Sequence, residues 1–450
     1  MDPDDPERMH FIDSLWMDLD TGDAPIAVGA VLEFVGRAPA VARVRQRIAE
    51  ILPGAARLRQ VPVHSRTGVL QPKWADAEPD LDVHVTREAV DDLGRAVSEL
   101  MSRPMSHDRP LWDITVFTGY APREWALVWR IHHSVADGEG VTMLVGRALD
   151  MVPDGGETLT DWMVSQALSM RPTAPGGDAD SGTSPMDRAL TFARHSVDQA
   201  VAAAAMTPAT VRGLLRMTPT PPSELSGSPA PGRDWRAIHL SLAEVKAAGK
   251  AHGATINDVL MSAVAGGFRE VILANGKDPE DRVVRALMPV SLRTPGDARS
   301  NNQVSMMPIE LPVGEADPVA RLGSVVRQTR QGKKSMVPAV VGAVSGALDR
   351  ALPQPLAEAI VPKFGWAFGW VLDTLVTNVR GPSEPLYFLG NEVRYLSPII
   401  PIGTSLRTVV GINSYNGSVN VSVTGDSLHG RDDRVLLDGI RLTVDSLLPQ

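Results

Sequence analysis

The chain has 450 residues, of which 43% are hydrophobic and 22% charged, and its formal net charge is −9. This composition is typical of globular proteins, and the length predicts two domains rather than one core. The acidic balance argues against nucleic acid as the main partner. The lack of cysteine excludes disulfides, thiolate metal sites and cysteine nucleophiles.

The sequence carries no recognisable targeting or membrane-spanning signal. The first residues, MDPDDPERMHF, are acidic and lack the basic and apolar regions of a signal peptide. No uncharged apolar run reaches the roughly 18 residues of a transmembrane helix. We therefore expect a cytoplasmic protein that at most lies on the surface of a membrane or lipid droplet.

Residues 1–152 alternate between short strands and helices, as expected for an α/β domain. Apolar runs and alternation predict strands, and apolar residues at helical spacing predict helices. The predicted strands are Pro25–Phe34, Leu81–Arg87, Leu111–Thr118 and Trp125–His133, and the predicted helices are Ala40–Leu52, Asp91–Ser102 and Gly140–Met151.

Residues 153–233 are rich in Pro, Gly and Ser, and we interpret them as a partly helical crossover linker between two domains. Two amphipathic helices are predicted here, at Asp187–Met206 and Thr207–Met217. Such helices pack on the protein or rest on a membrane, and the pattern leaves both alternatives open.

The alternation of strands and helices resumes in residues 234–450, which predicts a second α/β domain. A capping box at Ser241–Glu244 opens a helix that reaches Ala251. The other predicted helices are Thr255–Asn275, Asp317–Lys333 and Asp432–Leu448, and the predicted strands are Ala237–Leu242, Arg282–Pro289, Gln303–Leu311, Asp373–Val379, Glu392–Ser397, Ser405–Tyr415 and Ser418–Thr424.

The strand Trp125–His133 ends in two histidines, and Ser134–Gly138 then turns into a helix. Neighbouring side chains on a strand point to opposite faces, so one histidine can enter a cleft while the other packs behind it. A neutral histidine suits the removal of a proton from an alcohol that attacks a thioester, which is typically worth about 10²–10⁴-fold in rate. No enzyme nucleophile is needed, in agreement with a chain that lacks both cysteine and a Gly-x-Ser-x-Gly motif.

Other interpretations of this segment remain open. A single histidine is more often structural than catalytic. The pattern His-His-x-x-x-Asp holds metal-ligand types, but adjacent strand histidines diverge and no His-Glu-x-x-His occurs, so we expect no metal. Asp137 either orients His133, as in a catalytic triad, or stabilises the tight turn at Gly138.

Placed at a strand end, this motif resembles that of the bacterial wax ester synthase/diacylglycerol acyltransferase family. That family belongs to the superfamily of chloramphenicol acetyltransferase-like, coenzyme A-dependent acyltransferases, and condensation domains and plant acyltransferases share the HHxxxDG signature. Further segments support this family along the chain, namely Phe11–Leu15, Arg109–Trp112, Gly253–Leu260, Pro289–Arg293 and Thr377–Pro382.

The resemblance implies two chloramphenicol acetyltransferase-like domains with mixed sheets and an active-site tunnel between them. It implies that His133, beside His132, takes the proton of the acceptor hydroxyl. Asp137 would be structural and pair with an arginine of the second domain, for which Arg293 is the candidate. The remaining residues that the resemblance singles out are Gly138, Asn257, Asp258, Thr377 and Asn378 for the turn and the tunnel, and Pro110 and Trp112 for structure.

Asn257 stands at a helix start, where free N–H groups favour negative charge. It either helps to hold an oxyanion or caps the helix. The family's usual Ser-Asn-Val-Pro-Gly-Pro reads Thr-Asn-Val-Arg-Gly-Pro here, so Arg380 adds a charge near the tunnel. Ala27 stands where members often carry a histidine.

The leading hypothesis is transfer of a long-chain acyl group from acyl-CoA to a fatty alcohol or diacylglycerol. Acyl-CoA would be a co-substrate, with no permanently bound cofactor, and Lys246, Lys250 and Arg269 are either contacts for its phosphates or ordinary surface charges. One alternative is a condensation-type acyltransferase of secondary metabolism that uses a carrier-protein donor or a smaller acceptor. Another is a non-catalytic lipid carrier. The sequence leaves chain length, acceptor and oligomeric state open.

Overall fold

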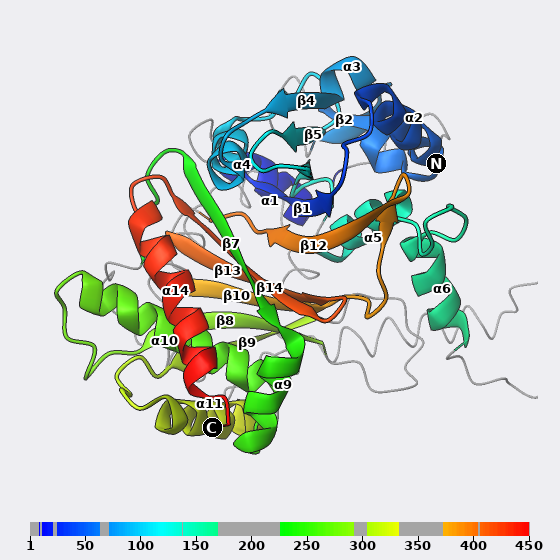
Figure 1. Cartoon of the computed structure of the whole chain (residues 1–450). Coiled ribbons are helices and arrows are strands. Elements are labelled where there is room, and N and C mark those ends of the chain that lie inside the picture. The colour runs from blue at the N-terminus through cyan, green and yellow to red at the C-terminus, as the bar shows by residue number, and fades with distance from the viewer. Residues whose placement is uncertain are drawn as a thin grey trace, which may run out of the picture.

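The computed structural model describes residues 9, 11–20, 25–63, 72–136, 138–169, 226–291, 304–332, 372–403 and 406–449. The described chain forms two six-stranded sheets with helices packed on them, and a separate hairpin of two strands (Figure 1). Both large sheets contain parallel and antiparallel pairs. The predicted fold class, α/β with two mixed sheets, is confirmed.

The first sheet has the strand order β11-β12-β1-β6-β5-β4. Its strands are β1 (Ala27–Val35), β4 (Val85–Ala89), β5 (Trp112–Thr118), β6 (Glu124–His132), β11 (Tyr387–Phe388) and β12 (Asn391–Ile399). The helices of this half are α1 (Phe11–Leu19), α2 (Val41–Ile51), α3 (Leu81–His84), α4 (Leu93–Ser102), α5 (Gly138–Ala148) and α6 (Leu159–Ser169), with 3₁₀ turns at Leu52–Gly54 and Ala56–Arg59. The hairpin consists of β2 (Gln60–Val63) and β3 (Lys73–Asp76).

The second sheet has the strand order β7-β14-β13-β10-β8-β9. Its strands are β7 (Arg233–Ser241), β8 (Val284–Ser291), β9 (Val304–Leu311), β10 (Thr374–Arg380), β13 (Thr408–Tyr415) and β14 (Ser418–Asp426). The helices α9 (Leu242–Ala251), α10 (Ile256–Ala274), α11 (Pro318–Gly332) and α14 (Gly430–Ser446) accompany it. A buried apolar core that includes Phe268 and Val410 joins α10 and α14 to this sheet.

The second half of the chain contributes two strands to the first sheet. β12 runs antiparallel to β1, with Gly29 opposite Ile399, and β11 pairs with β12 at the edge. Tyr415 at the end of β13 donates its hydroxyl hydrogen to the carbonyl oxygen of Val393 in β12, at 2.8 Å. Residues near 390 therefore lie against both sheets, and the division at residues 153–233 remains a proposal about folding units.

The prediction of a strand over Leu81–Arg87 was wrong in its first half. Residues Leu81–His84 form one helical turn, because the Asp80 carboxylate accepts the backbone N–H of Asp82 and caps it. The strand begins only at Val85. No helix or strand was predicted at α1, α6, β2, β3 or β11, whereas the two helices predicted between Asp187 and Met217 lie outside the described residues.

Among the described residues, no helix is both long and apolar enough to cross a membrane.

Candidate functional site

The two adjacent histidines separate as the strand periodicity predicts. β6 ends at His132, which is 1% exposed, and the chain turns at once, with the backbone N–H of Val135 bonded to the carbonyl of His132 at 2.9 Å. The backbone N–H of His133 donates to the carbonyl oxygen of Ile26 beside β1, at 3.0 Å, and its side chain is half-buried. His132 is thus enclosed, whereas His133 lies nearer the surface.

Helix α1 packs against both histidines. The Trp16 ring stacks on the His133 ring, with 4.2 Å between centroids and 23° between planes. The Asp20 carboxylate, which directly follows the helix, lies 2.9 Å from Nε2 of His132. Nothing in the sequence had singled out Trp16 or Asp20. A contact between residues 112 positions apart leaves no local pattern.

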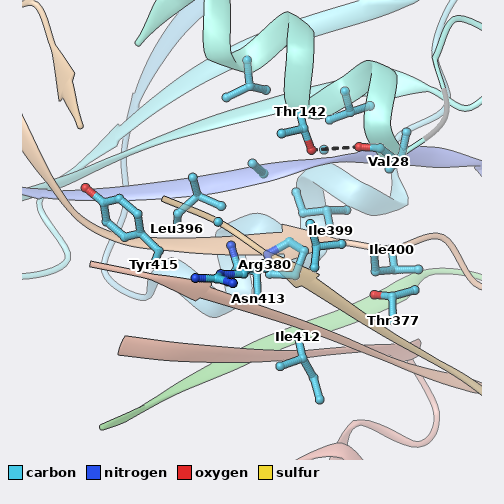
Figure 2. A pocket seen from close by; sticks show the side chains of 18 of the residues that line it. Val28, Thr142, Thr377, Arg380, Leu396, Ile399, Ile400, Ile412, Asn413 and Tyr415 are labelled. Carbon is cyan, nitrogen blue, oxygen red and sulfur yellow. Dashed lines mark hydrogen bonds between the residues drawn. The ribbon is translucent and has the colours of Figure 1, made fainter. Parts of the chain in front are cut away.

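A cavity lies between the two sheets, with an empty volume of about 800 Å³ that includes open solvent. Gly138, after the histidine turn, lines this cavity, whereas His133 is not among its described lining residues. Its walls come from β1, α5, β10, β12 and β13, and most of the lining is apolar (Figure 2). Of the five residues that the resemblance assigned to the turn and the tunnel, Gly138 and Thr377 line this cavity, whereas Asn257, Asp258 and Asn378 do not. Other lining residues include Val28, Val141, Val145, Leu149, Leu396, Ile399, Asn413 and Tyr415.

The polar groups of the cavity are few. Thr377 Oγ1 is buried and has no hydrogen-bond partner within the described part of the chain, so it is open to a ligand atom. Burial raises the pKa of the Tyr415 hydroxyl, which keeps it neutral. Arg380 is the only charged residue among the described residues of the lining, and Figure 2 draws its guanidinium group close to Asn413 in this view.

The predicted pair of asparagines does come together. Asn378 donates through Nδ2 to Oδ1 of Asn257, at 3.1 Å, which links β10 to the first turn of α10. Nδ2 of Asn257 lies 3.5 Å from the sulfur of Met288. The alternative that Asn257 caps its helix was wrong, because the capping residue is Thr255.

Asp258 completes that cap. Its Oδ2 accepts the backbone N–H of Thr255 at 2.9 Å and the Thr255 hydroxyl at 2.7 Å, and its Oδ1 accepts the Thr329 hydroxyl at 2.7 Å. The residue is 5% exposed and does not line the cavity. Both carboxylate oxygens are thus used within the fold, which favours a structural role over the tunnel role that the resemblance implied.

Trp112 and Pro110 support the strand that carries the histidines. The Trp112 indole N–H donates to the carbonyl oxygen of Leu58 at 2.8 Å, and its ring packs on buried His84. Burial lowers the pKa of His84, so this histidine is held neutral. The backbone N–H of Trp112 bonds the carbonyl of Pro110 at 2.9 Å.

The remaining predicted residues do not join this cluster. Lys246 and Lys250 are exposed on α9, and neither lines the cavity. The Arg269 guanidinium is bonded to the carbonyl oxygens of Val313 and Gly314. Asp137 and Arg293 lie outside the described residues, so their pairing stays a prediction.

No group of three or more His, Asp or Glu side chains suited to a metal ion occurs among the residues that the structure describes.

Comparison with known proteins gives the same family at both ends of the chain. The family model described as the wax ester synthase/diacylglycerol acyltransferase catalytic domain matches residues 9–260, and the model of the WS/DGAT C-terminal domain matches residues 300–447. The chain is 29% identical over 420 residues to the probable diacylglycerol O-acyltransferase tgs1 of Mycobacterium tuberculosis, covering 89% of this chain and 86% of that protein. A second relative in the same organism, the probable diacylglycerol O-acyltransferase tgs2, is 27% identical over 420 residues, covering 90% and 91%.

Solved structures show the same fold at lower identity. The wax ester synthase/diacylglycerol acyltransferase from Marinobacter aquaeolei VT8 superimposes with a TM-score of 0.67 at 22% identity, covering 98% of each chain. The first condensation domain of the calcium-dependent antibiotic synthetase superimposes with a TM-score of 0.59 at 18% identity, covering 98% of this chain and 96% of that one. These likenesses are to the fold alone.

Proposed function

Because the chain belongs to the wax ester synthase/diacylglycerol acyltransferase family and is therefore an acyltransferase, we propose that it moves a long-chain acyl group from acyl-CoA to the hydroxyl of a fatty alcohol or diacylglycerol. His133 acts as the general base. The observation that carries this proposal is a half-buried histidine directly after β6, five residues before Gly138, which lines a largely apolar cavity between the two sheets.

The proposed reaction is a direct acyl transfer. Nδ1 of His133 is fully buried, so Nε2 is the nitrogen that meets the substrate. Nε2 removes the proton from the acceptor hydroxyl while its oxygen attacks the thioester carbonyl. The tetrahedral intermediate then collapses, the carbon–sulfur bond breaks, and the CoA sulfur takes the proton back from His133. Ester and free CoA are the products, and no covalent enzyme intermediate forms.

The cavity suits an alkyl chain. Its lining is mostly aliphatic, as in sites that bind apolar ligands. Thr377 offers an otherwise unused hydroxyl to a substrate oxygen. Asn257, held by Asn378 at the start of α10, is a candidate donor to the oxyanion, because a helix start favours negative charge.

The proposal also covers the contacts of the CoA phosphates and of the lipid phase. Lys246 and Lys250 lie four residues apart on an exposed part of α9, and we keep them as candidate contacts for the CoA phosphates. Contact with a membrane or lipid droplet would follow from the substrates, since both acceptors are lipids that collect in such phases.

The test is release of CoA from palmitoyl-CoA, followed with a thiol reagent, in the presence of hexadecanol, dioleoylglycerol or buffer alone. The protein has no cysteine, so it adds no thiol signal of its own. We expect release that needs an acceptor, and a loss of about 10²-fold or more in His133→Ala. His252→Ala is the matched control, because His252 lies at the end of α9 and does not line the cavity.

Acceptor-independent release, or full activity of His133→Ala, would contradict the proposal. A donor tethered to a carrier protein is the second arm of the assay. Turnover with that donor but not with palmitoyl-CoA would move the protein toward the chemistry of condensation domains.

A further inference from the structure

Helix α1 and the residue after it hold both members of the histidine pair, although they lie more than 110 positions before it in the chain. Asp20 reaches His132, and Trp16 covers one face of His133. The backbone N–H of Asp20 bonds the carbonyl of Trp16 at 3.1 Å, so these two residues form one rigid unit at the end of the helix.

The Asp20 contact determines which ring nitrogen of His132 carries the proton. Nδ1 of His132 accepts the backbone N–H of Ser134 at 3.1 Å, so the ring proton belongs on Nε2, which donates it to the Asp20 carboxylate. Both nitrogens are thereby used, and the ring is 1% exposed. His132 therefore anchors the helix to the end of β6 and leaves the base function to its neighbour.

We propose that Trp16 is a positioning residue for His133, which fixes the plane of its imidazole and favours the imidazolium that forms when it takes a proton. The inference rests on the proposed function of His133. A ring stacked at 4.2 Å and 23° restricts rotation about the side-chain bonds of the histidine. The face of an indole also attracts a cation, so the stack is stronger once His133 is protonated.

Charged and titratable groups of the described residues lie near the pair on several elements. From α1 and its end come Asp20, already bonded to His132, and from β6 comes His132 itself. The His107 ring lies 6.2 Å from that of His132, and the charge of Arg233 at the start of β7 interacts with that of Asp20. None of these groups changes in a Trp16 variant, so a shift in the pH profile reports on the stack.

The experiment compares Trp16→Leu and Trp16→Phe with the wild type. For CoA release from palmitoyl-CoA with hexadecanol, we expect Trp16→Leu to lower kcat about tenfold or more with little change in KM. We also expect the acid limb of kcat/KM to move to lower pH by roughly half a unit, because the protonated base loses its cation–π contact. Trp16→Phe retains an aromatic face, so its kcat and its acid limb should lie close to those of the wild type. Asp18→Asn, on an exposed position of the same helix, is the control.

An unchanged kcat and acid limb in folded Trp16→Leu would overturn the inference. So would a rise in KM alone, because Trp16 would then be a wall of the substrate site. The titration of the His133 ring by NMR gives the same comparison without turnover. An unaltered titration of His133 refutes the stacking effect, whether or not the enzyme is active. Inactivity on every lipid acceptor counts only against the proposed function. If Trp16→Leu does not fold, the partial effect of Trp16→Phe decides.

Discussion

Replacement of Asp258 by alanine tests whether this carboxylate at the start of α10 stabilises the fold or binds substrate. The substitution removes three hydrogen bonds of 2.7–2.9 Å, two from Thr255 and one from Thr329. Thr329 can redirect its hydroxyl to the carbonyl of Val326, 3.2 Å away, so only the Thr255 groups are fully abandoned. At roughly 1 kcal/mol for each bond and for the cap, the free energy of unfolding should fall by about 2–4 kcal/mol.

For a unit of about 200 residues, that loss corresponds to a fall in the melting temperature of roughly 5–10 °C. Thermal unfolding followed by circular dichroism measures it, and CoA release at low temperature gives the activity of each folded molecule. Thr255→Ala is the matched variant, since it breaks the same cap from the other side. We expect both variants to be less stable and to keep near wild-type turnover. A variant Asp258→Ala that melts with the wild type but does not turn over would refute the structural assignment.

Three further outcomes are expected. Gly29→Ala should lower the free energy of unfolding, measured by urea denaturation, by about 2 kcal/mol or more, because the added Cβ would collide with the Trp129 carbonyl oxygen across the β1–β6 pair. Normal stability would show that the strands can separate there. Burial, followed by the nearby charge of Asp234, raises the pKa of Asp433 well above 3.8. The folded state therefore keeps a proton on Asp433 that the unfolded state releases, and the free energy of unfolding should fall as pH rises above about 3.8. Asp433→Asn should remove that loss and raise the urea midpoint at pH 8 but not at pH 4, whereas a lower midpoint at pH 8 would contradict the assigned direction. Arg380→Met should raise kcat/KM for hexadecanol about two- to fivefold. The Arg380 guanidinium has no ion pair within the described part of the chain and loses hydration when an alkyl chain fills the cavity, whereas a methionine side chain does not. An equal or lower value would mean that Arg380 does not face the bound chain.

Local patterns were enough to predict most elements and the position of the histidine pair. Alternation along residues 125–133 predicted that one histidine would be enclosed and the other accessible, since side chains on a strand diverge whatever surrounds them. Ser241 caps its helix as predicted by accepting the Glu244 backbone N–H, because this bond depends on four consecutive residues, whereas the reciprocal bond of a capping box is not among the described contacts. The strand prediction failed at Leu81–His84, because the Asp80 side chain caps a helical turn there and this local cap outweighs a short apolar alternation.

What could not be predicted depends on contacts between distant parts of the chain. Neither the Trp16 stack nor the Asp20 hydrogen bond has a sequence pattern, because each joins α1 to residues more than 110 positions later. The same is true of Asn378 and Asn257, which the family resemblance placed in one site but whose hydrogen bond no spacing could indicate. The family resemblance thus singled out these two residues, and their hydrogen bond could be seen only in the folded structure.

The strand β12 explains why the cavity belongs to both halves of the chain. It is hydrogen-bonded to β1, while Pro398 beside its end accepts the Trp235 indole N–H of β7 and the Ser422 hydroxyl of β14. Separation of the two sheets would therefore break these side-chain bonds, while the β1–β12 ladder, which lies within the first sheet, would stay intact. Because these bonds join the two sheets, we expect that the long acyl chain of the proposed reaction enters lengthwise through the open part of the cavity rather than by parting of the sheets.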